Sequence, residues 1–145
     1  MLVNKNSKIF LAGHQGMVGS AILKKLKENG YQNIITRNRK QLDLLDQAKT
    51  FKFLKKNKPQ FVIIAAARVG GINANLKSKD KFLYENLQIQ NNLIHGSYIA
   101  GVKNVFFLGS SCIYPSKCKQ PMKEKYLLTG PFENTNEGYA IAKVS

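Results

Sequence analysis

Three evenly spaced glycines near the N-terminus constrain the fold of this chain more than any other feature. Gly13, Gly16 and Gly19 follow a short apolar run, residues 8–12, and open a segment, residues 17–28, whose apolar residues recur at helical spacing. A strand, a glycine-rich turn and a helix in this order are typical of a dinucleotide site. The first glycine permits a tight turn, the second lets a pyrophosphate approach, and the third lets the helix pack against the strand. The helix N-terminus then offers N–H groups and a partial positive charge to the phosphates.

The end of the second expected strand, residues 33–36, indicates which dinucleotide would bind. NAD sites usually carry an acidic residue there, but this chain has Arg37 and Arg39, whose guanidinium groups match the oxygens of a 2′-phosphate. This favours NADP(H), and a solvated basic turn is the alternative. The expected cofactor contacts are Gly13, His14, Gln15, Gly16, Met17, Val18, Gly19, Arg37, Arg39, Leu108, Gly109 and Lys143.

Strands and helices are expected to alternate along the chain with short links between them. This alternation predicts an α/β fold, a doubly wound parallel sheet of the Rossmann type. Ligands of such sheets bind at the carboxyl ends of the strands, which would place residues 13–19, 65–71 and 109–115 along one rim. The expected strands are residues 8–12, 33–36, 60–67 and 104–108; the expected helices are residues 17–28, 46–56, 80–100 and from about 135 onward, after an irregular loop over residues 110–134.

Length and composition bound the class of protein. The 145 residues suffice for one dinucleotide-binding domain, and 43% of them are hydrophobic, which is enough for a core. No apolar run approaches the roughly 18 residues that span a membrane. The first six residues carry no apolar leader, so we expect a cytoplasmic protein. Cys112 and Cys118 lack the spacing of a zinc site and suit reduced thiols, so neither a metal nor a disulfide is expected.

The chain is strongly basic, which raises the question of an anionic partner. Its 23 basic and 8 acidic residues give a formal net charge of +15. Such an excess can indicate nucleic-acid binding. However, the lysines are spread over nearly every segment, and no basic helix alternates with aromatic residues. We therefore do not expect nucleic acid as a partner.

Four side chains in the last third of the sequence carry the expected chemistry. Tyr139 and Lys143 are four residues apart, so a helix would place them on one face. An ammonium near a phenol favours the phenolate, so we expect Lys143 to lower the pKa of Tyr139, which would exchange a proton with a carbonyl or alcohol oxygen. Ser110, at the end of the fourth expected strand, can hold the same oxygen. Tyr-x-x-x-Lys alone is common by chance, and Cys112 could be a small buried filler.

Together these motifs resemble those of the extended short-chain dehydrogenase/reductases and, more narrowly, the GDP-L-fucose synthase family. The resemblance runs from about residue 8 to residue 144 and rests on the stretches GHQGMVGSAI, AAARVGGINAN, LGSSCIYP and TGPFENTNEGYAIAK and on the two arginines. It implies an NADPH-dependent epimerase-reductase that converts GDP-4-keto-6-deoxy-D-mannose to GDP-L-fucose. The alternatives are another nucleotide-sugar epimerase or dehydratase of the same superfamily and a non-catalytic NADP-binding module.

The resemblance also implies a role for each of the four side chains. Ser110 and Tyr139 would bind the 4-keto oxygen, and Lys143 would support the phenol and the nicotinamide ribose. Cys112 would move the protons of carbons 3 and 5. These roles agree with the chemistry, because a 4-keto group acidifies both neighbouring carbons and hydrogen bonds to its oxygen stabilise the enolate. Gln15 departs from the family, which generally has Arg there, so the preference for NADP(H) would depend on the arginines of the second strand.

The resemblance further implies that residues 1–145 form an incomplete, C-terminally truncated domain. The family's substrate domain and its catalytic histidine would follow Ser145, and neither His14 nor His95 substitutes for that histidine. We therefore expect the isolated chain to be inactive and its fourth strand to leave an open, aggregation-prone sheet edge. The complete protein is expected to be a homodimer that acts on a GDP-sugar.

Overall fold

The computed structural model describes residues 4–145, and the chain divides into two compact units. Among the described residues, the sheet unit comprises residues 4–67 and 88–108, and the loop unit comprises residues 68–87 and 109–145. Residues 1–3 belong to the N-terminal segment that was expected to carry no apolar leader, and they lie outside the described residues.

Four parallel strands form the sheet of the sheet unit, in the order β2-β1-β3-β4. They are β1 (Ile9–Ala12), β2 (Ile34–Arg37), β3 (Phe61–Ile64) and β4 (Asn104–Phe107). The predicted doubly wound parallel sheet is thereby confirmed, and among the described strands β4 is at the edge, as expected. The third strand is shorter than predicted. Because β1 ends at Ala12, the pairing of β3 stops soon after, with a last hydrogen bond from the Ala65 N–H to the Ala12 carbonyl at 3.0 Å.

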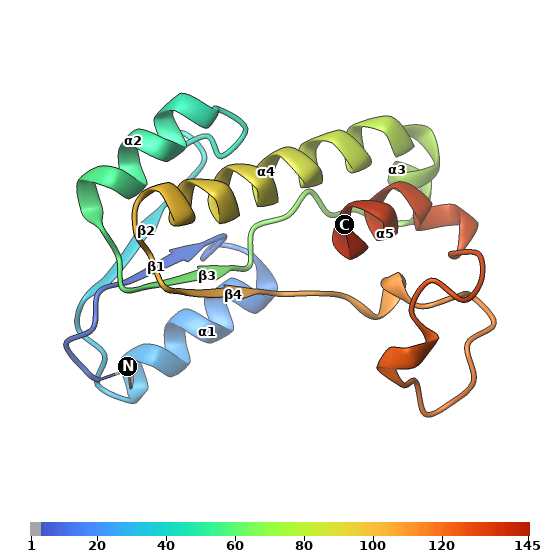
Figure 1. The fold of residues 1–145 in the computed structure, drawn as a ribbon, viewed down its shortest axis with the longest axis horizontal. Helices are drawn as coiled ribbons and strands as arrows, with labels where there is room; N and C mark the ends of the chain where they lie inside the picture. The colour runs from blue at the N-terminus through green and yellow to red at the C-terminus, as the bar shows by residue number, and fades with distance from the viewer. Residues whose placement is uncertain (1–3) are drawn as a thin grey trace. The chain divides into compact units, whose positions relative to one another are not determined.

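Helices cover both faces of this sheet (Figure 1). Helix α1 (Met17–Glu28) lies on one face, and α2 (Gln47–Asn57) lies on the other together with residues 88–99 of α4 (Lys79–Ile99). Alternate residues of the central strands face opposite sides. The main core cluster consists of Phe10, Ala12, Leu42, Leu54, Val62, Ile64 and Leu93, all buried.

Local sequence signals determine where these helices start and stop. Asp46 caps α2, because its carboxylate accepts a hydrogen bond from the Lys49 N–H at 2.9 Å. The same helix ends at Asn57, and its C-cap Lys58 has a left-handed φ of 44° and precedes Pro59. Beyond α1, Gly30 has a φ of 78°, a conformation that suits glycine at a helix C-terminus.

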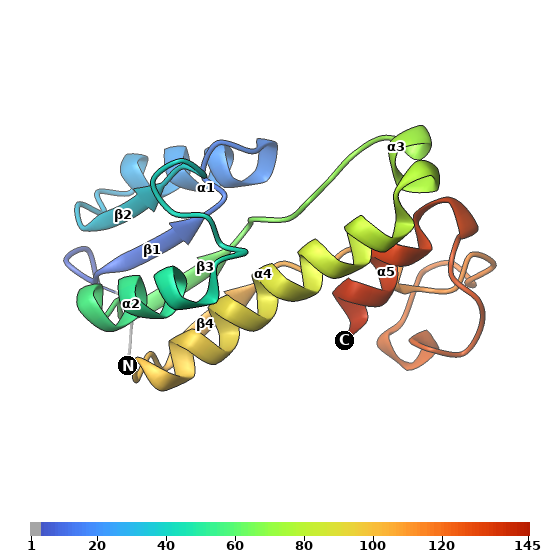
Figure 2. The ribbon, with the colours of Figure 1, turned by 90° about the horizontal axis from the view of Figure 1, so that it is seen from above.

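The loop unit is built from short elements (Figure 2). It contains α3 (Ile72–Lys77), residues 79–87 of α4 and α5 (Glu137–Val144). The expected irregular loop carries three single turns of 3-10 helix at residues 111–113, 124–126 and 134–136. Helix α3 was not predicted, because it is short and follows a glycine pair. Asn75 stabilises its start by donating to the carbonyls of residues 70 and 71 at 3.0 and 3.2 Å.

Candidate functional site

The glycine turn of the sheet unit connects β1 to α1, and two of its glycines are required by close packing. Gly13 has a φ of +87°, and a Cβ there would lie 2.5 Å from the backbone nitrogen of Ala66. A Cβ at Gly19 would overlap the Gly13 carbonyl oxygen. A Cβ at Gly16 would meet only that oxygen, at an ordinary 3.5 Å. The space beside Gly16 is therefore open to a ligand atom, whereas the other two glycines keep the turn closed.

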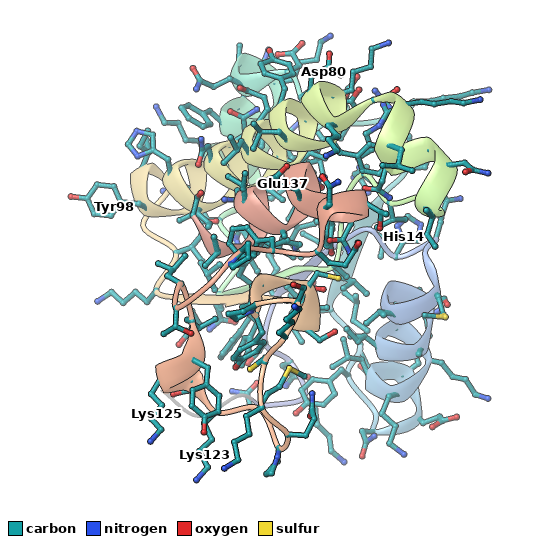
Figure 3. All side chains as sticks on the ribbon, turned by 90° about the vertical axis from the view of Figure 1, so that its right-hand side faces the viewer. His14, Asp80, Tyr98, Lys123, Lys125 and Glu137 are labelled. Atoms are coloured by element: carbon teal, nitrogen blue, oxygen red, sulfur yellow. The ribbon has the colours of Figure 1, made fainter. Side chains whose placement is uncertain are left out.

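The first turn of α1 fits an anion. Its N-cap, Gly16, contributes no side-chain hydrogen bond, and the turn contains no acidic residue. Gln15 is exposed, as are Met17 at 86% and Val18 at 48%. Backbone N–H groups at an uncapped helix N-terminus attract phosphate. The ring of His14 lies in the same turn (Figure 3), and its Nδ1 is buried without a hydrogen-bond partner among the described residues.

Two arginines lie at the carboxyl end of β2, as expected. Arg37 donates to the Thr36 carbonyl at 2.7 Å, and its guanidinium lies 5.7 Å from the centre of the Phe53 ring. Arg39 forms an exposed ion pair with Asp43, with 3.7 Å between Nε and Oδ2. Exposed pairs of this kind contribute little stability, so a phosphate could compete for the guanidinium. Both side chains thus suit a 2′-phosphate.

Two cofactor contacts were expected at the end of β4, and they belong to different units of the chain. Leu108 belongs to the sheet unit, where its N–H donates to the Ile64 carbonyl at 3.3 Å. Gly109 begins the second segment of the loop unit. The four residues expected to perform the chemistry all follow it and lie in the loop unit.

Within the loop unit, the structure brings Ser110 and Tyr139 together. Ser110 caps the 3-10 turn at residues 111–113 and accepts a hydrogen bond from the Cys112 N–H at 3.2 Å. Its hydroxyl also hydrogen-bonds the Tyr139 phenol. Cys112 and Cys118 are both free thiols, and each is partly exposed. Two hydroxyls and one thiol are therefore close to one another, although a long loop separates Ser110 from Tyr139.

The electrostatics of Tyr139 differ from the expectation. Burial is the main cause that raises its pKa above 10.0, negative charge on Cys112 raises the pKa further, and the Ser110 hydrogen bond lowers it. The expected lowering by Lys143 is wrong for this structure. The Lys143 ammonium lies over the ring face, 6.0 Å from its centroid, and burial lowers the pKa of Lys143 itself. Tyr139 is consequently a protonated phenol at neutral pH.

The start of α5 is held tightly, which places Tyr139. Lys79 donates to the Asn134 side-chain oxygen at 2.6 Å and forms an ion pair with Glu137 at 3.4 Å. A Cβ at Gly138 would overlap the Lys79 carbonyl oxygen. The backbones of α4 and α5 therefore approach closely at Gly138, directly before the phenol.

Two asparagines organise this unit, although the sequence predicts no role for them. Asn136 donates a hydrogen bond from Nδ2 to the Cys112 Sγ at 3.1 Å. Asn86 accepts from the Arg68 N–H at 2.8 Å and donates to the Arg68 carbonyl at 3.0 Å. The Arg68 guanidinium in turn pairs with Glu85 at 2.6 Å. Both asparagines lie in the expected helical segments, but nothing in their local sequence indicates these long-range partners.

Two lysines of the loop and one histidine of α4 are exposed surface side chains. Lys123 and Lys125 project outward from the 3-10 turn at residues 124–126 (Figure 3). His95 is exposed on α4, where its ring packs against Phe51 and Tyr98 at centroid distances of 5.8 and 6.3 Å. Among residues 4–145, no helix is both long enough and apolar enough to cross a membrane.

Comparison with known sequences gives a consistent picture. A model of the NAD dependent epimerase/dehydratase family matches residues 9–145. The putative GDP-L-fucose synthase 2 of Arabidopsis thaliana is 52% identical over 99% of this chain, and the GDP-L-fucose synthase of Escherichia coli K12 is 46% identical over 95%. The chain spans 44% and 43% of the lengths of these two relatives.

A solved structure extends the similarity to three dimensions. The GDP-mannoheptose C4 reductase MlghC of Campylobacter jejuni, solved with NADP bound, is 40% identical and superposes with a TM-score of 0.94. The match covers 99% of this chain and 45% of that one.

Proposed function

The chain belongs to the NAD dependent epimerase/dehydratase family, and from that premise we propose that it carries the cofactor-binding and proton-transfer residues of a GDP-sugar epimerase-reductase. The proposed overall reaction converts GDP-4-keto-6-deoxy-D-mannose to GDP-L-fucose with NADPH. GDP-L-fucose synthases at 46–52% identity support this substrate, and the NADP-bound reductase supports this cofactor.

One observation carries the proposal: the loop unit gathers the hydroxyls of Ser110 and Tyr139 with the thiol of Cys112, whose N–H donates to the Ser110 hydroxyl at 3.2 Å. Two hydroxyl donors can hold the 4-keto oxygen of the sugar. Their hydrogen bonds stabilise negative charge on that oxygen when a neighbouring carbon loses its proton. The Cys112 thiolate would remove the proton from carbon 3 or 5, and return of a proton to the opposite face would complete each epimerisation.

The protonation state of Tyr139 suits the reductive step. When bound, NADPH supplies a hydride to carbon 4. The developing alkoxide needs a proton, and Tyr139 is a protonated phenol because burial raises its pKa. Lys143 is buried, with its ammonium 6.0 Å from the centre of the phenol ring, and would support the nicotinamide ribose rather than lower the pKa of the phenol.

The residues of the sheet unit fit the dinucleotide. Gly16 leaves open space where a Cβ would block a pyrophosphate, and the first turn of α1 has no capping side chain among the described residues. Arg37 and Arg39 would hold the 2′-phosphate that distinguishes NADPH from NADH. Titration calorimetry of the chain with each dinucleotide tests this assignment. We expect tighter binding of NADPH and loss of that preference in Arg37→Ala/Arg39→Ala; equal affinities in the unsubstituted chain would contradict it.

The proton transfer is tested by hydrogen exchange. A full-length protein that contains this chain is incubated in D2O with GDP-4-keto-6-deoxy-D-mannose, and NMR follows the protons of carbons 3 and 5. We expect exchange that Cys112→Ser abolishes and Cys118→Ser leaves unchanged. Exchange at equal rates in the unsubstituted protein and in Cys112→Ser, or no exchange in either, would contradict the role of the thiol.

A further inference from the structure

We propose that Asn136 is a positioning residue that holds Cys112 as a thiolate aimed for proton transfer, an inference that rests on the proposed function. The side-chain Nδ2 of Asn136 donates to the Cys112 Sγ over 3.1 Å. The sulfur belongs to a free thiol that is partly shielded from solvent. The contact joins the start of α5 to the turn that follows Ser110.

Asn136 lies at the N-terminus of α5 but does not make the hydrogen bond that an asparagine usually makes at that position. Asn136 is the N-cap of α5, where the side-chain oxygen normally accepts a hydrogen bond from the first turn. Here it makes no such bond, and its Oδ1 is buried without a partner among the described residues. A buried acceptor without a partner costs stability. The amide is therefore directed at the sulfur rather than at the helix.

The surroundings fix this amide in place. The Asn136 N–H donates to the Glu133 carbonyl at 3.2 Å, and the neighbouring Asn134 is held by Lys79 at 2.6 Å. On the other side, the Cys112 N–H is bound to the Ser110 hydroxyl at 3.2 Å. Both partners thus have anchored backbones, as alignment of a catalytic base requires.

The direction of the hydrogen bond determines what it does. A thiolate accepts a charge-assisted hydrogen bond, which is roughly twice as strong as the bond that a neutral group accepts. An N–H donor at the sulfur therefore favours the thiolate over the thiol. Only the thiolate can remove a proton from carbon. Asn136 would thus raise the fraction of the active base and fix its direction.

The test compares the pH dependence of alkylation by iodoacetamide in Cys118→Ser, where Cys112 is the only thiol, with that in Asn136→Leu/Cys118→Ser. Near neutral pH, the variant should react about threefold more slowly, because it has about tenfold less thiolate and each thiolate is about threefold more nucleophilic. At high pH, Cys112 is fully ionised in both proteins, so the Asn136→Leu variant should react about threefold faster. The two profiles should therefore cross.

Other outcomes would overturn the proposal. A change in the same direction at every pH would mean that Asn136 affects only access to the sulfur, and coincident profiles would mean that it has no effect. A crossing in the opposite sense would mean that the amide oxygen accepts from the thiol. Cys112→Ser serves as the control, because alkylation of its Cys118, whose Sγ lies 3.7 Å from the Lys119 carbonyl, should not respond to Asn136→Leu.

A second measurement needs no substitution at Asn136. In Cys118→Ser, the side-chain amide resonances of Asn136 should shift with pH in step with the alkylation rate, and this shift should vanish in Cys112→Ser/Cys118→Ser. Resonances that do not respond to pH would overturn the proposal even if Asn136→Leu fails to fold. Neither measurement uses a dinucleotide or a GDP-sugar, so failure of the proposed function would be seen separately.

Discussion

The Ser110 hydroxyl hydrogen-bonds the Tyr139 phenol, and this bond opposes the two other influences on the phenol. Burial raises the pKa of Tyr139, negative charge on Cys112 raises it further, and the bond from Ser110 lowers it. Burial is the largest of the three, so the phenol keeps its proton at neutral pH. Because the three causes come from distinct groups, substitutions can separate them.

Ser110→Ala and Cys112→Ser should shift the pKa of Tyr139 in opposite directions. Removing the serine hydroxyl removes the hydrogen bond that favours the phenolate, so the pKa should rise. Removing the thiol removes the negative charge that disfavours the phenolate, so the pKa should fall. Carbon-13 NMR of ring-labelled tyrosine follows each titration, with the exposed Tyr98 as internal reference. Shifts of the same sign in both variants would contradict the assignment of these causes.

Two glycines of the turn should respond differently to alanine. Gly19→Ala places a methyl group against the Gly13 carbonyl, so overpacking should lower the free energy of unfolding by about 1–3 kcal/mol. Gly16→Ala meets no close atom and keeps an extended φ of −76°, so it should cost less than about 1 kcal/mol. Urea denaturation monitored by circular dichroism measures both values.

If the pyrophosphate approaches Gly16, Gly16→Ala should impair NADPH binding even though it costs less stability than Gly19→Ala. Gly16→Ala should then weaken NADPH binding by about tenfold or more, which is about 1.4 kcal/mol, while remaining folded. Calorimetry on the folded variant measures this affinity. A Gly16→Ala chain that binds NADPH as well as the unsubstituted chain would place the pyrophosphate elsewhere.

Much of the sheet unit follows from local sequence signals. Helix α1 has the predicted bounds, residues 17–28, and Asp46 caps the next helix as expected. These features depend on residues close together in the chain: apolar periodicity, a capping carboxylate and glycine at turns. Helix α3 was missed for the same reason, because a six-residue helix after two glycines shows too little periodicity to be distinguished from a loop.

The residues of the candidate site can be proposed from the sequence, but the electrostatics of Tyr139 cannot. Spacing alone indicated that Tyr139 and Lys143 share a helix face, and the structure places the ammonium over the ring. The predicted direction of the Tyr139 pKa shift was wrong. Burial, which is a property of the folded unit, raises this pKa and outweighs the pairing with Lys143 that the spacing suggested. The contact between Asn136 and Cys112 likewise depends on how the loop returns to α5.

Lys143→Met should stabilise the fold in a pH-dependent way. Burial lowers the pKa of Lys143 from 10.5 in the folded chain, so between the two pKa values the unfolded chain binds a proton that the folded chain lacks. The free energy of unfolding therefore rises with pH across this window and is lowest below the folded pKa. Relative to the unsubstituted chain, Lys143→Met should be most stabilised at neutral pH, and its advantage should shrink as the pH approaches 10.5.

Melting temperatures at a series of pH values measure this difference. Lys52→Met, at an exposed position of α2, controls for removing one positive charge. An advantage of Lys143→Met that stays constant or grows with pH would show that burial does not disfavour the ammonium.

The edge strand β4 should make the chain associate with itself through Phe106. This side chain is 60% exposed on the outermost described strand, next to Val105 at 36%. An exposed apolar edge strand can pair with other chains. Phe106→Ser should therefore reduce association in sedimentation velocity and change the free energy of unfolding by less than about 0.5 kcal/mol. The neighbouring Phe107 packs on the core cluster, so Phe107→Ser should instead destabilise the fold by about 2 kcal/mol or more. Equal association of the Phe106→Ser and unsubstituted chains would mean that this strand edge is not the contact.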